Sequence, residues 1–115
     1  MVDLSMKTDV KVADDVINEI AGISATSVKG VVCLGEGLTF KNIHFMGTRN
    51  LKKGIKIIEN DDGSITIKLT VTLKSGVEIK KVSSSIQEKI KESIESMLDI
   101  RVKDVVVKVA KIDDI

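Results

Sequence analysis

The residue types that support catalysis or metal binding are scarce in this chain of 115 residues. It has one cysteine, Cys33, and one histidine, His44. Zinc sites draw several ligands from these two residue types, so one chain cannot assemble such a site. Cys33 lies in an apolar run, where a buried and inert thiol is the usual outcome, and His44 has no evident partner to orient it. We therefore predict no catalytic residue, no metal site and no cofactor.

Other patterns that resemble functional motifs fit turns and loops better. Asp61 and Asp62 are adjacent carboxylates, but they lie in the sequence NDDG, which is typical of a turn between two strands. The GEG sequence at 35–37 lacks the lysine and the glycine spacing of a phosphate-binding loop. A small basic group could meet phosphates or anionic lipid headgroups, although a solvated loop is the favoured interpretation; it comprises Lys41, Arg49, Lys52 and Lys53.

Composition limits the function classes further. The 18 basic and 17 acidic residues give a net charge of +1, and aromatic residues make up only 2%. Both values disfavour nucleic-acid binding. The longest apolar run is far shorter than the roughly 20 residues of a membrane-spanning helix, and no signal peptide is evident. We predict a single cytoplasmic domain over residues 1–115, which reaches the inner face of a membrane only through a partner protein or a surface contact.

Periodicity predicts the elements. The run 78–98 has apolar residues at steps of three and four, which indicates a long helix with one buried stripe. The stripe comprises Ile79, Val82, Ile86, Ile90, Ile94 and Met97. A first helix is expected from Asp14 to Lys29, with Asp14 or Asp15 as its cap and Gly30 in a left-handed turn after it.

Alternating segments predict strands at 8–12, 55–57, 65–73 and 105–109, with a hairpin at the NDDG turn, and the apolar run 31–34 predicts a buried strand. The resulting order is β-α-β-β-β-α-β. It indicates an α+β fold, a two-layer sandwich with a mixed or antiparallel sheet and two helices packed on one face. Residues 38–53 fit either a hairpin arm or a loop. Their apolar residues would be costly to expose as one patch, so we predict a partner contact there, made by Leu38, Phe40, Ile43, Phe45 and Met46.

Several short segments together resemble the alkaline shock protein family, in order and in interval. They are VINEIA at 16–21, VKGV at 28–31, GIKI at 54–57, the stretch 69–76 leading to Ile79, Val82 and Ile86-Gln87, then MLDIRV at 97–102 and VVVKV at 105–109. The chain departs from the family pattern at Ala13, where a serine cap is common, and at Asp99, where glycine is common. Capping is then expected to move to Asp14, and Asp99 must adopt a left-handed conformation.

The resemblance implies a non-enzymatic bacterial protein. Some members are associated with alkaline or cell-envelope stress, some are held at the inner face of the membrane by a separate transmembrane partner, and some self-associate. On this basis we expect a scaffold protein in cell-envelope stress homeostasis, acting as a homo-oligomer or with a membrane-anchored partner. The alternative implied by the family is a regulator that binds a fatty-acid-synthesis enzyme such as acetyl-CoA carboxylase.

Overall fold

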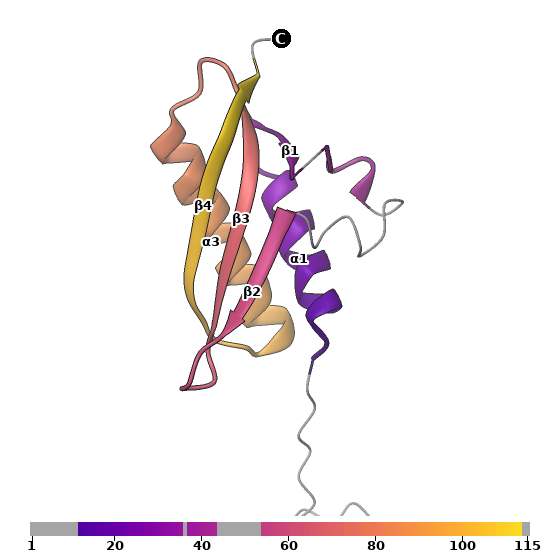
Figure 1. Ribbon diagram of the computed structural model, residues 1–115, viewed down its shortest axis with the longest axis vertical. Coiled ribbons are helices and arrows are strands. Elements are labelled where there is room, and N and C mark those ends of the chain that lie inside the picture. Colours follow the sequence, from indigo (N-terminus) through magenta and orange to yellow (C-terminus); the bar gives the residue numbers. More distant parts are fainter. Residues whose placement is uncertain (1–11, 36, 44–53, 114–115) are drawn as a thin grey trace, which may run out of the picture.

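The long strand β3, Ile65–Lys74, lies at the centre of the sheet and pairs along both of its edges (Figure 1). Strand β4, Val102–Asp113, runs parallel to it along its whole length on one edge. On the other edge, β2, Ile55–Glu59, and β1, Val31–Leu34, lie end to end and antiparallel to β3. The computed structural model describes residues 12–35, 37–43 and 54–113.

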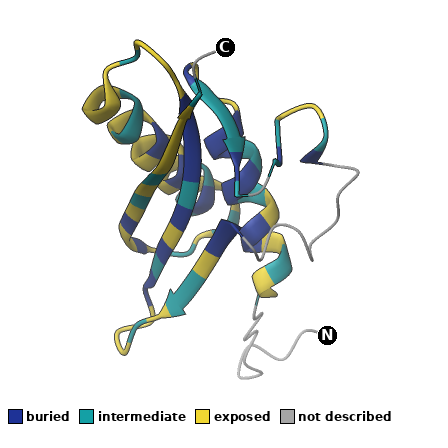
Figure 2. Cartoon of the chain, turned by 45° about the horizontal axis from the view of Figure 1, so that its top comes forward, coloured by how far each residue is buried: buried dark blue, intermediate teal, exposed yellow. Residues whose placement is uncertain are grey.

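Two helices cover one face of this sheet. Helix α1 spans Asp14–Thr26, helix α3 spans Ile79–Leu98, and the two pack against each other. Alternation along β3 sets the covered face. Every second side chain is at most 5% exposed (Figure 2), and the side chains between them are threonines and lysines. The α+β prediction, with two helices on one face of a mixed sheet, is confirmed; the buried positions of β3 are Ile65, Ile67, Leu69, Val71 and Leu73.

The buried stripe of α3 is shorter than the sequence predicts. Ile86, Ile90 and Ile94 are fully buried. Ile79 and Met97, by contrast, are 47% and 67% exposed. Both lie on the same side of the helix as the buried isoleucines, but they are in its first and last turns, where no described element covers them. The prediction that they are buried is therefore wrong, and the centre of the helix carries the packing.

The helix ends follow backbone conformation more than side-chain capping. Ala13 is the N-cap of α1 and makes no side-chain hydrogen bond, so the prediction that Asp14 or Asp15 caps this helix is wrong. Asp14 and Asp15 lie in the first turn, where their negative charges interact favourably with the positive end of the helix dipole. The helix also ends at Thr26, earlier than predicted. Gly30, at φ +101°, and Asp99, at φ 55°, adopt the left-handed conformations expected of them.

Two predicted segments fall partly or wholly outside the described residues. Of the proposed strand at 8–12, only Val12 is described, and it is not in a strand. Of the ambiguous segment 38–53, residues 38–43 are described. Leu38 forms an isolated antiparallel bridge with Leu34. A turn follows, in which the Asn42 side chain accepts a hydrogen bond from the Thr39 N–H at 2.8 Å.

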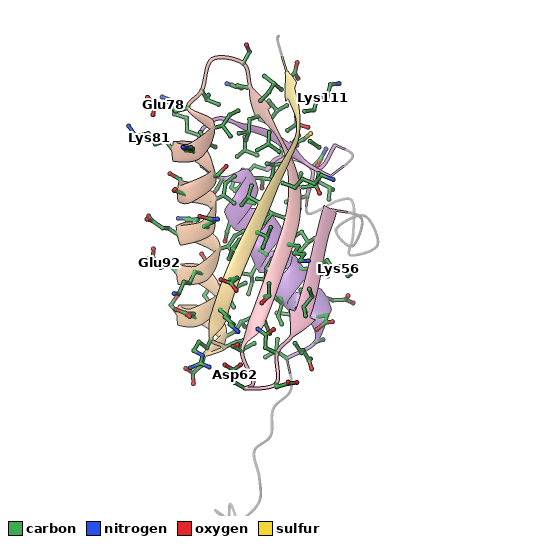
Figure 3. The ribbon with its side chains drawn as sticks, turned by 60° about the vertical axis from the view of Figure 1, so that its left-hand side comes forward. Lys56, Asp62, Glu78, Lys81, Glu92 and Lys111 are labelled. Atoms are coloured by element: carbon green, nitrogen blue, oxygen red, sulfur yellow. The ribbon has the colours of Figure 1, made fainter. Side chains whose placement is uncertain are left out.

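The NDDG turn between β2 and β3 is tied to the start of β4. Asp62 accepts hydrogen bonds from the hydroxyl of Ser64 at 2.6 Å and from its backbone N–H at 3.0 Å. Arg101 pairs with the same carboxylate at 2.6 Å, and Figure 3 labels Asp62 at this turn. These contacts, the Ser64 bonds first, lower the pKa of Asp62. The turn interpretation of the two carboxylates is thus confirmed, and Asp62 has a structural role.

We expect Ile90→Ala to lower the free energy of unfolding by about 2–5 kcal/mol, because it leaves a cavity in the core. Ile79→Ala, the same change on the same helix at an exposed position, should cost about 1 kcal/mol or less. Urea denaturation of both variants measures the two values. Equal losses of unfolding free energy in the two variants would contradict the conclusion that only the centre of α3 is buried.

The pKa of Asp62 gives a second test. Ser64→Ala should raise this pKa toward its ordinary value, and Arg101→Gln should raise it less, because the Ser64 contacts have the larger effect. The lowered pKa means that the Asp62 carboxylate stabilises the fold above its unfolded-state pKa of about 3.9, and that this contribution is lost as pH falls through the folded-state value. Carboxyl NMR titration measures each pKa. A larger rise in Arg101→Gln would show that the ion pair dominates.

Candidate functional site

The residues with potential chemistry do not form a site in the described part of the chain. Cys33 is half-buried on β1, in register with Thr72 of β3. His44, Arg49, Lys52 and Lys53 lie outside the described residues. Among residues 12–35, 37–43 and 54–113, no three histidine, cysteine or acidic side chains gather as metal ligands would.

The five predicted partner-contact residues separate into three groups. Leu38 and Ile43 are 2% and 3% exposed and belong to the hydrophobic core. Phe40 between them is 51% exposed. Phe45 and Met46 lie outside the described residues. Alternation in the sequence could not show that the turn at 39–42 folds its flanking residues inward, so Phe40 is the described residue on which this prediction now depends.

A second candidate surface is the outer edge of β4. The N–H of Ile65 donates to the carbonyl of Arg101, and the parallel register then directs the backbone groups of Val105, Val107 and Val109 away from β3. Such groups on an edge strand are free to pair with another chain. The alternating pattern of 105–109 predicts a strand, but it does not reveal which edge of the sheet this strand occupies.

Helix α3 covers the first half of this edge. The side chain of Gln87 donates to the carbonyl of Val105 at 3.0 Å, and the N–H of Val102 donates to the carboxylate of Glu95 at 3.0 Å. Beyond Val105, no hydrogen bond from another described element reaches the outward groups of Val107 or Val109. We call residues 107–112 the free edge of β4.

The third candidate surface is the sheet face that the helices leave uncovered, which we call the open face. It has a hollow of about 540 Å³ at the junction of β2, β3 and β4. Lys56, Lys68 and Lys108 line the hollow, together with Thr70 and Val106. In the sequence, these lysines can be recognised only as residues on the solvent-facing side of alternating strands. Their proximity depends on strand register, which the sequence does not specify.

None of the helices in the described part of the chain is long and apolar enough to cross a membrane.

Comparisons with known proteins agree with the resemblance noted in the sequence. The chain is 34% identical over 96 residues to the uncharacterized protein YqhY of Bacillus subtilis, covering 84% of this chain and 70% of that protein. It is 31% identical over 93 residues to the uncharacterized protein Spy1614 of Streptococcus pyogenes, covering 79% of this chain and 76% of that protein. No solved structure matches. A family profile matches residues 3–113, and the chain therefore belongs to the alkaline shock protein 23 family, which has a cell envelope-related function.

Proposed function

We propose that this chain is a non-catalytic scaffold protein of the cell envelope, which associates with further copies of itself or with a membrane-anchored partner through the free edge of β4. The observation that carries the proposal is the contrast along this edge. Side chains of α3 satisfy Val102 and Val105, whereas Val107 and Val109 have backbone groups turned outward without such a cover. Unpaired edge groups are a template for strand addition.

The position of Phe40 supports a scaffold with more than one contact. Residues 38–43 lie beside β1 and α1, on the side of the sheet opposite to the β4 edge (Figure 1). Phe40 is exposed there, and its neighbours Leu38 and Ile43 anchor the segment in the core. Two different surfaces on opposite sides allow head-to-tail contacts, which extend an assembly where a single self-complementary surface closes it.

Val107→Pro tests the edge. It should abolish self-association while the fold is retained, because it removes an outward N–H that makes no ladder hydrogen bond. Val106→Pro, one residue earlier, removes an N–H directed at β3 and should instead destabilise the protein, because it breaks a ladder hydrogen bond. Sedimentation velocity over a concentration series measures association, and circular dichroism checks the fold. Unchanged association of folded Val107→Pro would contradict the proposal.

Gln87→Ala should have the opposite effect on self-association to Val107→Pro. It frees the carbonyl of Val105 and extends the uncovered edge by one residue pair, so self-association should increase. Lys89→Ala, an exposed substitution on the same helix, serves as the matched control and should leave association unchanged.

If wild-type protein stays monomeric at every concentration, pull-down from separate membrane and soluble fractions decides between partners. A membrane protein lost with Val107→Pro supports the scaffold, and a soluble biotin-bearing enzyme favours the regulatory alternative.

A further inference from the structure

Strand register brings three lysines from three strands to one place on the open face. Lys56 of β2 lies directly opposite Lys68 of β3. On the other side of β3, Lys68 lies opposite Val106 and Thr70 lies opposite Lys108. The three lysine side chains are exposed, and Figure 3 shows Lys56 on the outer strand β2. The three ammonium groups therefore belong to adjacent strands of one face.

The charges around this group are unbalanced. No acidic residue lines the hollow between the three lysines, and no ion pair joins them to a carboxylate of the described residues. The two acidic residues of β4 on this face, Asp104 and Asp113, lie opposite Thr66 and Lys74, and neither lines the hollow. Like charges directly opposite each other on neighbouring strands destabilise a sheet. The arrangement of Lys56 and Lys68 thus has a cost that a bound anion would offset.

The hollow suits a small anionic group. Its volume of about 540 Å³ lies within the range of small-molecule sites, about 300–1,000 Å³. The half-buried Thr70 supplies a hydroxyl beside the ammonium groups, and Val106 supplies an apolar wall. Lysine binds phosphate as a point charge, and a phosphate group has enough acceptor oxygens for several such donors.

We propose that the hollow lined by Lys56, Lys68, Lys108 and Thr70 binds a phosphate group, carried by a soluble molecule or by a lipid headgroup. The site does not rest on the scaffold proposal. Lys108 belongs to the free edge as well, but the hollow is lined by side chains on the face of the sheet, whereas strand addition uses the outward backbone groups of β4. It also differs from the small basic group around Lys41, which lies in another segment of the chain.

The test is a binding titration with two probes. Pyrophosphate, followed by NMR shifts of Thr70 and Val106, represents a soluble ligand; vesicles of phosphatidylglycerol, with phosphatidylcholine vesicles as the neutral control, represent headgroups. K56Q/K68Q/K108Q should weaken binding roughly a hundredfold, since each lysine near an anionic group contributes a factor of about five. K80Q/K89Q/K91Q removes the same charge from exposed positions on α3 and should leave binding within a factor of about two.

Binding of either probe that is lost in the first triple variant and retained in the second supports the site, and the probe that binds identifies the source of the phosphate. Three results would overturn the proposal. They are no binding of either probe, equal loss in both triple variants, and equally tight binding of a poly-glutamate peptide, which would indicate a general acidic-protein contact. Val107→Pro should bind the probe like wild type, so failure of the scaffold proposal and failure of this site are distinguishable.

Discussion

The pairing of β3 on both edges and its burial on one face are the constraint on which the rest of the structure depends. A parallel neighbour cannot follow through a short turn, so β4 must be reached by a crossover, and α3 supplies it. The crossover brings Ile86, Ile90 and Ile94 over the apolar side of β3. The antiparallel hairpin with β2 and the short β1 then fill the opposite edge. Helix α1 completes the layer above them.

Much of this architecture follows from local pattern. Ile65 to Leu73 alternate over the length of a strand, and the isoleucines of α3 recur at helical spacing, so both elements and their buried sides are predictable. The NDDG turn and Gly30 are predictable because their backbone conformations favour few residue types. The predictions that fail concern the ends of helices. Ile79 and Met97 continue the periodicity of α3, but periodicity does not tell where the covering surface stops.

The candidate surfaces were less predictable, because they depend on contacts between distant segments. Leu38 and Ile43 look like an exposed apolar patch in the sequence, yet a short turn folds both into the core and leaves Phe40 outside. The three lysines of the hollow are separated by 12 and 40 positions in the chain, and only the pairing of β2 and β4 with β3 brings them together. The resemblance to the family indicated its cell-envelope relation but none of these surfaces.

An edge strand with unpaired backbone groups can pair with other chains, and the two halves of the β4 edge limit this pairing in different ways. In the first half, Gln87 and Glu95 occupy the outward backbone groups. In the second half no described side chain does so, and Lys108 and Lys111 line the strand. Lysine on an edge limits indiscriminate pairing, because a second strand of the same kind meets repulsion. A strand that adds to this edge must therefore be matched in register so that lysines avoid each other, or must contribute acidic side chains opposite them. The charge pattern of the free edge thus limits which strands can add to it.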